Sequence, residues 1–189
     1  MINPDKVQES YFAWRPQDDP DFAPMIYGSG TIGGKGRSLL FALRKLRDSG
    51  DPMLSATKIP KSIYFSVDIF HQFLEAVPNF ETLIAQNDPE RIENVFLATP
   101  LPKIVSEAVR RFLTEINDPV VVRSSSRLED STKHSFAGKY LSTFLSNNFP
   151  SLEERARRVE DDIRKIYARI YFPKAVGYRK KHGLGDDDM

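Results

Sequence analysis

The segment Val120-Val121-Val122-Arg123-Ser124-Ser125-Ser126 decides the fold, and Phe136-Ala137-Gly138 follows it closely along the chain. Three successive valines predict a short buried strand, because β-branched side chains suit a pleated sheet. An arginine and a group of serines come directly after this strand. The planar donor fork of arginine and the serine hydroxyls are suited to binding phosphate. An ordinary surface salt bridge of Arg123 would explain the same residues, so a second segment is needed to decide.

A glycine-rich run, Gly28-Ser29-Gly30-Thr31-Ile32-Gly33-Gly34-Lys35-Gly36-Arg37-Ser38, is that second segment. The leucines after it recur at helical spacing and predict an amphipathic helix over residues 38–49. Glycines let backbone N–H groups approach an anion closely, and a helix N-terminus adds further unpaired donors. We expect Lys35 to lie in the loop and to reach a terminal phosphate. A flexible glycine linker is the other interpretation of this run.

Neither common phosphate-binding motif describes the glycine-rich run. Its first three glycines match G-x-G-x-x-G, but that pattern requires a clear strand before it. Pro24 interrupts residues 22–27 and makes them a poor strand. The Walker-type pattern also fails, because Gly36 follows Lys35 where Ser or Thr belongs. The sequence therefore predicts a phosphate-binding loop of neither standard kind.

Together the segments resemble the N-terminal nucleotide-binding domain of the phosphoenolpyruvate synthase and pyruvate phosphate dikinase family. Four segments carry the resemblance, in the family's order and at similar spacing, over about residues 30–185. They are Ile32-Gly33-Gly34-Lys35-Gly36, the proline-led strand of residues 58–66, Val122-Arg123-Ser124-Ser125 with Glu129-Asp130 and Ser135-Phe136-Ala137-Gly138, and the basic helix end of residues 175–183. Lys139 departs from the family, which often has glutamine there, and such departures leave the acceptor substrate open.

The resemblance implies an α+β fold: the first part of an ATP-grasp-type nucleotide-binding domain, with a mixed sheet and flanking helices. It also implies ATP and Mg²⁺ as cofactors, with the metal held mostly by carboxylates outside this chain. For Glu129 and Asp130 a loop salt bridge is as good an explanation as a role at the magnesium water shell. No catalytic or metal-ligating residue is assigned within the chain. The residues matched to nucleotide binding are Gly33, Gly34, Lys35, Arg123, Ser124, Ser125, Glu129, Asp130 and Gly138.

The function implied by the resemblance is that of the ATP-binding portion of a multidomain phosphotransferase. Such an enzyme passes a phosphoryl group from ATP to a histidine on another domain, and then to pyruvate or a related acceptor. The expected partners are the nucleotide and two downstream domains, a phosphohistidine domain and a phosphoenolpyruvate/pyruvate barrel. Neither fits in 189 residues, so we expect the chain alone to be inactive. The alternatives are a non-catalytic module that senses a nucleotide or docks onto a partner, and an interaction domain with a vestigial site.

Composition excludes several other classes of protein. A formal net charge of +1 argues against a general nucleic-acid binder, and the absence of cysteine removes disulfides and Cys-based zinc sites. No apolar run is long enough to cross a bilayer, and the N-terminus lacks the order of a secretory signal. We therefore expect a cytoplasmic protein without a membrane partner.

The chain is expected to divide into an extended N-terminal arm or linker over residues 1–27, the nucleotide-binding part over 28–185, and an acidic tail over 186–189. Within the second part we predict a strand over 63–67 that runs into a helix capped by Ser66. A helix over 104–116, strands over 120–123 and 140–145, and a long helix from Ser151 complete the pattern. The polar loop between the last two strands is a candidate mobile lid.

Overall fold

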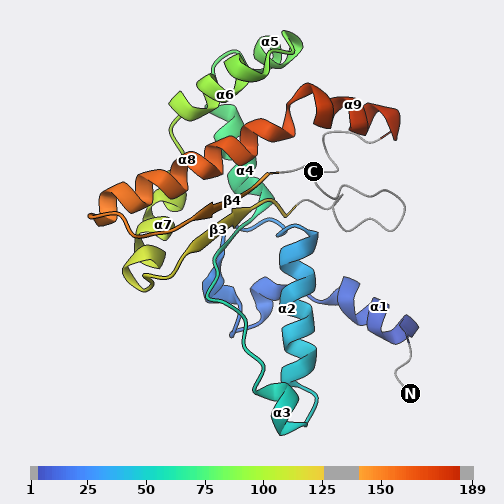
Figure 1. Cartoon of the computed structure of the whole chain (residues 1–189). Coiled ribbons are helices and arrows are strands. Elements are labelled where there is room, and N and C mark those ends of the chain that lie inside the picture. The colour runs from blue at the N-terminus through green and yellow to red at the C-terminus, as the bar shows by residue number, and fades with distance from the viewer. Residues whose placement is uncertain (1–3, 126–140, 184–189) are drawn as a thin grey trace.

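The structure is a computed structural model that describes residues 4–125 and 141–183, with side chains from residue 7 onward. Helices dominate, two short 3₁₀ turns precede the first strand, and the predicted α+β class is confirmed (Figure 1). The helices and 3₁₀ turns are α1 (Pro4–Ala13), η1 (Pro16–Asp18), η2 (Ala23–Met25), α2 (Gly34–Arg47), α3 (Pro52–Ser55), α4 (Val67–Glu75), α5 (Phe80–Ala85), α6 (Pro89–Ala98), α7 (Lys103–Thr114), α8 (Leu152–Ile170) and α9 (Pro173–Lys181). The strands are β1 (Ile26–Tyr27), β2 (Tyr64–Phe65), β3 (Val120–Arg123) and β4 (Ser142–Leu145).

The strands of the described residues form two separate pairs rather than the one mixed sheet that was expected. β1 pairs with β2 in parallel, and β3 pairs with β4 in an antiparallel hairpin. In the hairpin, Val121 lies opposite Phe144 and Arg123 lies opposite Ser142. The predicted strand over 120–123 is confirmed residue for residue, and β4 lies within the range predicted for the second strand.

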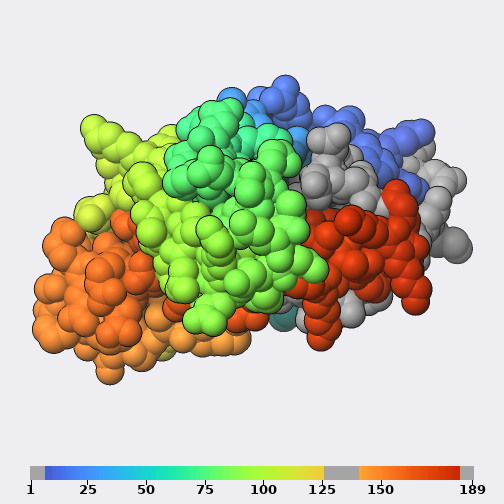
Figure 2. Space-filling view, turned by 90° about the horizontal axis from the view of Figure 1, so that it is seen from above, coloured from blue at the N-terminus to red at the C-terminus, as the bar shows by residue number. Residues whose placement is uncertain are grey.

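The larger core lies between α4, α6, α7, α8 and the β3–β4 hairpin. α8 runs along the hairpin and packs on α6 and α7 (Figure 1), and seen from above, α5 and α6 lie between the start of α8 and α9 (Figure 2). The helical periodicity predicted for 104–116 and for the long helix after Ser151 is confirmed, and the Ser151 hydroxyl caps α8 by accepting the Glu154 amide at 3.1 Å. The fully buried side chains of this core include Phe73, Ile92, Phe96, Val105, Val109 and Leu113.

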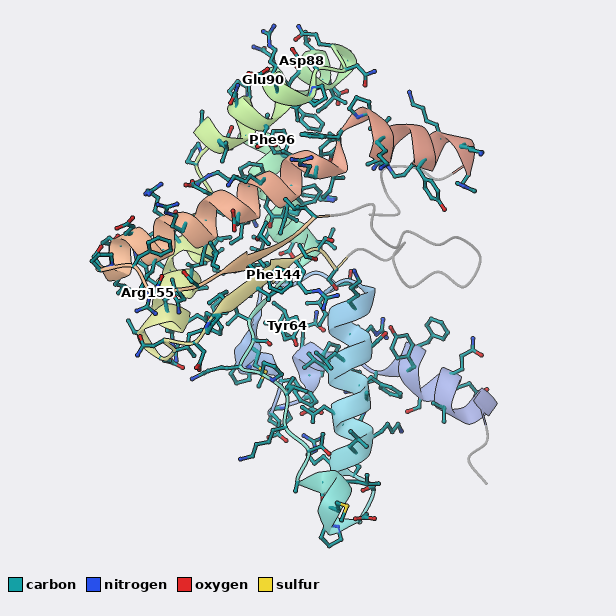
Figure 3. All side chains as sticks on the ribbon, in the orientation of Figure 1. Tyr64, Asp88, Glu90, Phe96, Phe144 and Arg155 are labelled. Atoms are coloured by element: carbon teal, nitrogen blue, oxygen red, sulfur yellow. The ribbon has the colours of Figure 1, made fainter. Side chains whose placement is uncertain are left out.

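Arg155 of α8 fixes the hairpin relative to α7 (Figure 3). Its guanidinium donates to the carbonyls of Leu113, at 2.8 Å, and Ile116, at 2.5 Å, near the end of α7. It also donates to the Asn147 side chain at 2.8 Å, just beyond β4. One charged side chain therefore ties the end of α7 to the segment that follows β4. Because β3 begins shortly after α7, this contact also helps to fix the start of β3.

A smaller core forms around α2 and the N-terminal segment. The described part of residues 1–27 contains α1 and two 3₁₀ turns rather than extended chain, whereas the division of the chain at residue 27 stays a prediction. Arg37 of α2 closes the end of α1 by donating to the carbonyls of Tyr11, at 2.7 Å, and Trp14, at 2.8 Å. The buried side chains of this core are Trp14, Phe22, Ile32, Leu40 and Phe41.

The start of α2 corrects the predicted helix boundary. The helix begins at Gly34 rather than at Ser38, so Lys35 lies in the first helical turn and not in the preceding loop. Gly33 has extended backbone at the N-cap position, and its carbonyl accepts the Arg37 amide at 3.0 Å. The leucine periodicity begins only at Leu39, so the sequence pattern could not show the first turn.

Candidate functional site

The end of β3 meets the start of α2, although these two segments are far apart in the sequence. The Gly36 amide donates to the Ser125 hydroxyl at 2.9 Å, across a separation of 89 residues. Gly33 lies so close to Ser125 that a Cβ atom on residue 33 would be 0.9 Å from the Ser125 carbonyl oxygen. The structure therefore brings together Gly33, Gly34 and Lys35 with Ser124 and Ser125. Their assignment to a nucleotide stays a prediction.

Two cationic side chains flank this junction. Lys35 is partly buried and stands next to Gly36 in the first turn of α2, where the helix dipole favours an anion. Arg123 is exposed at the end of β3, two residues before Ser125, which is about 7 Å along an extended strand. Among the described side chains, those of residues 7–125 and 141–183, no carboxylate forms an ion pair with Arg123. The described part of the chain thus offers no salt bridge to explain this arginine.

Ser125 has a role that the sequence did not reveal. Its hydroxyl accepts a first-turn amide of α2, and so serves as a cap that comes from a distant segment. A hydroxyl donates and accepts at the same time, so this bond leaves the Ser125 proton available to a phosphate oxygen. The same side chain can hold the helix start in place and contact an anion bound there.

The first half of the glycine-rich run binds a carboxylate of the chain itself. Asp68, in the first turn of α4, accepts the backbone amides of Ser29, at 3.0 Å, and Gly30, at 2.8 Å, and it also contacts the Ser66 hydroxyl. Burial alone would raise the pKa of Asp68, but these hydrogen bonds outweigh it and lower the pKa to about 2. Gly28 has a φ of +97°, and a Cβ there would lie 2.0 Å from the Ser66 hydroxyl oxygen. The G-x-G-x-x-G pattern therefore serves internal packing at this end of the run.

The structure tests three interpretations of this region. Pro24 lies in the η2 turn, which keeps residues 23–25 out of a strand, and only Ile26–Tyr27 form the short strand β1, which pairs in parallel with β2. The loop is also no flexible linker, because the Val67 amide donates to the Thr31 carbonyl at 2.9 Å. Ser66 stands at the N-cap position of α4, but its hydroxyl donates to the Tyr27 carbonyl at 2.9 Å rather than capping the helix.

Three of the predicted site residues, Glu129, Asp130 and Gly138, lie outside the described residues, as does the predicted lid after Ser125. The glycine-rich run, Lys35, Arg123, Ser124 and Ser125 therefore make up the part of the site whose geometry is known.

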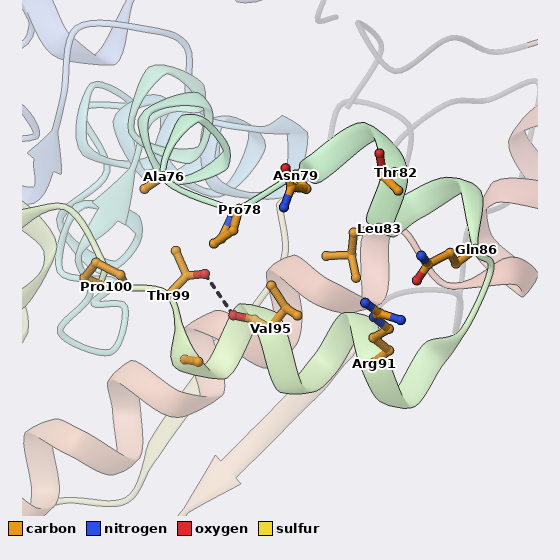
Figure 4. Close-up of a pocket in the computed structure, with 11 residues that line it drawn as sticks. Ala76, Pro78, Asn79, Thr82, Leu83, Gln86, Arg91, Val95, Thr99 and Pro100 are labelled. Carbon is orange, nitrogen blue, oxygen red and sulfur yellow. Dashed lines mark hydrogen bonds between the residues drawn. The ribbon is translucent and has the colours of Figure 1, made fainter.

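A pocket of about 560 Å³ lies elsewhere, between the end of α4, α5 and α6 (Figure 4). Its polar lining residues are Asn79, Thr82, Gln86, Arg91 and Thr99, and the Thr99 hydroxyl donates to the Val95 carbonyl at 2.8 Å. None of the described residues predicted to bind a nucleotide is among those that line this pocket. The described residues of the β3–α2 junction are therefore separate from this pocket.

A comparison with known protein families identifies the kind of domain that contains this junction. The model of the pyruvate phosphate dikinase AMP/ATP-binding domain matches residues 29–189. The chain belongs to this family. The matched range contains the start of α2, the end of β3 and every residue that the sequence assigned to the nucleotide.

Two curated proteins have sequences that are similar to this chain. The prodigiosin synthesizing transferase PigC of Serratia marcescens is 26% identical over 162 residues, which cover 82% of this chain and 16% of the relative. The phosphoenolpyruvate synthase of Deinococcus radiodurans is 36% identical over 91 residues, which cover 47% of this chain and 11% of the relative. The chain thus spans less than a fifth of the length of either relative. No solved structure matches it significantly.

Within the described part of this AMP/ATP-binding domain, no three His, Asp or Glu side chains gather in a way that could hold a metal ion. None of the described helices is both long and apolar enough to span a membrane.

Proposed function

We propose that the chain is the ATP-binding portion of a multidomain phosphotransferase, and that the start of α2 binds the triphosphate. The contact between the Gly36 amide and the Ser125 hydroxyl supports this proposal, because Lys35 directly precedes Gly36 and Arg123 lies two residues before Ser125. Membership of an AMP/ATP-binding domain family supports a nucleotide as the ligand. The acceptor would be a histidine on a separate domain, and then pyruvate or a related compound.

Each described residue has a distinct task in this proposal. The Lys35 ammonium binds the terminal phosphate as a point charge, and the Arg123 fork binds two oxygens with parallel hydrogen bonds. The Ser124 and Ser125 hydroxyls donate to neighbouring oxygens. Each hydrogen bond to a charged group contributes about 1.5–3 kcal/mol. Phosphoryl transfer depends mainly on positioning and charge neutralisation, so a chain that only holds and orients the nucleotide supplies an essential part.

Titration calorimetry with ATP tests the site. Lys35→Ala and Arg123→Ala are each expected to weaken ATP binding by the 189-residue chain at least tenfold, while the circular dichroism spectrum stays unchanged. Arg91→Ala is the matched control, because Arg91 is an exposed arginine that lines the separate pocket. ATP binding of wild-type strength in both site variants, or none by the wild-type chain, would contradict the proposal.

Phosphoryl transfer is tested in the full-length polypeptide with ATP labelled at the γ-phosphate. We expect label on a histidine outside residues 1–189, and at least a tenfold loss of labelling in the Lys35→Ala and Arg123→Ala variants. ATP binding without any transfer of label would instead favour a non-catalytic module that senses the nucleotide or docks onto a partner.

A further inference from the structure

The two faces of the β3–β4 hairpin differ sharply in their surroundings. Val120 is buried in the larger core, and Val122 and Leu145 pack against that core. Side chains alternate along a strand, so the residues between these lie on the opposite face. There Val121 is 45% exposed and Phe144 is 80% exposed (Figure 3). Val121 and Phe144 therefore form a small exposed apolar patch on the open face of the hairpin.

The register places this apolar patch beside Arg123. Val121 lies directly opposite Phe144, and Arg123 lies opposite Ser142, which is two residues before Phe144. Arg123 and Phe144 are therefore diagonal neighbours on the open face, about 7–8 Å apart by their Cα atoms. A cation suited to phosphate and an exposed aromatic ring thus share one surface.

The length of β3 relates the patch to the junction with α2. Ser125 contacts Gly36, and Val121 lies four residues earlier, which is about 13 Å along an extended strand. A nucleoside triphosphate extends over a comparable length from its terminal phosphate to its base. A triphosphate at the start of α2, with the nucleotide lying along β3, would bring the base to Phe144.

We propose that Phe144, supported by Val121, is the platform on which the nucleotide base stacks. This inference rests on the proposed function and adds a specific binding residue to it. Phe144 would cover one face of the base, and the other contacts of the base would come from outside this chain. Alanine substitution of an aromatic side chain that stacks on a base weakens binding by roughly fivefold to over a hundredfold.

Two ligands separate the platform from the phosphate site. ATP carries a nucleoside and inorganic tripolyphosphate does not, so calorimetry of the 189-residue chain with both ligands isolates the contribution of the base and its ribose. Phe144→Ala is expected to weaken ATP binding about tenfold and to leave tripolyphosphate binding unchanged, and Phe144→Trp should retain ATP binding. Phe12→Ala is the matched control, because Phe12 is a 66% exposed phenylalanine on α1, and it should change neither affinity.

The remaining outcomes distinguish a failure of the stacking platform from a failure of the phosphate site. If the Phe144→Ala variant binds ATP as strongly as the wild type, or if its affinities for ATP and tripolyphosphate fall equally, the platform alone is overturned. Sedimentation that shows wild-type dimers but Phe144→Ala monomers, with unchanged ATP affinity, would mean that a second copy covers the patch instead. A wild-type chain that binds neither ligand would contradict the proposed function, and the platform would fail with it.

Discussion

Substituting Gly33 by alanine tests whether the close contact between α2 and β3 builds the site. The backbone of Gly33 has a φ of −61° and a ψ of 173°, which alanine adopts readily, so any effect comes from the added methyl group. That methyl would lie 0.9 Å from the Ser125 carbonyl oxygen and 2.0 Å from its carbonyl carbon. An ordinary contact begins at 3.4 Å, so the two segments must separate by about 2.5 Å.

Such a displacement has a cost that the structure allows us to estimate. Overpacking costs about 1–3 kcal/mol, and loss of the bond from the Gly36 amide to Ser125 costs about 0.5–1.5 kcal/mol more. We expect Gly33→Ala to lower the free energy of unfolding by about 2–4 kcal/mol, and to weaken ATP binding because the end of β3 moves away from Lys35. Urea unfolding followed by circular dichroism measures the first effect, and calorimetry measures the second.

Gly177→Ala is the matched control for this substitution. Gly177 lies within α9, and a Cβ there would meet nothing within 4 Å. Alanine is favoured over glycine inside a helix by roughly 0.5–1 kcal/mol, so this variant should be slightly more stable than the wild type. A Gly33→Ala protein as stable as the wild type, with unchanged ATP affinity, would refute the packing at the junction.

Three further substitutions test the surrounding framework. Because the pKa of Asp68 is lowered to about 2, its ionised form stabilises the fold above the unfolded value near 3.9, and this contribution is lost as the pH falls through 2. Asp68→Asn should therefore flatten the dependence of the urea midpoint on pH between about 4 and 2, and an unchanged slope would contradict the assignment. Ser125→Ala should cost about 1 kcal/mol and speed hydrogen exchange of the Gly36 amide, whereas unchanged exchange would exclude the cap. Arg37→Ala frees carbonyls at the end of α1, so cleavage by a protease in residues 4–14 should become faster, and equal cleavage rates would show that Arg37 does not hold α1.

Local patterns predicted the elements whose stability is local or strongly periodic. The three valines of β3 and the helical spacing in α7 and α8 are confirmed in the structure. The start of α2 was missed because Gly34, Lys35 and Gly36 carry no helical signal. Contact with Ser125 supports that turn, and no local pattern contains a residue 89 positions away.

Other parts of the site could not be predicted for the same reason. The carboxylate of Asp68 bonds to the amides of Ser29 and Gly30, which are 39 and 38 positions earlier in the chain. The only local sign of these contacts in the sequence is that a hydroxyl, at Ser66, and a carboxylate, at Asp68, stand two positions apart. The exposure of Phe144 also required the register of the hairpin, because its alternation alone did not show which face packs on α8.

The backbone amide shifts of the ¹⁵N-labelled chain during an ATP titration test the central claim most directly. The account predicts saturable shifts at Gly34, Lys35 and Gly36 in the first turn of α2 and at Arg123 in β3, with no change at Gln86 in the separate pocket. Shifts confined to Gln86 and its neighbours, with the first turn of α2 unaffected, would contradict the claim that the start of this helix binds the phosphates.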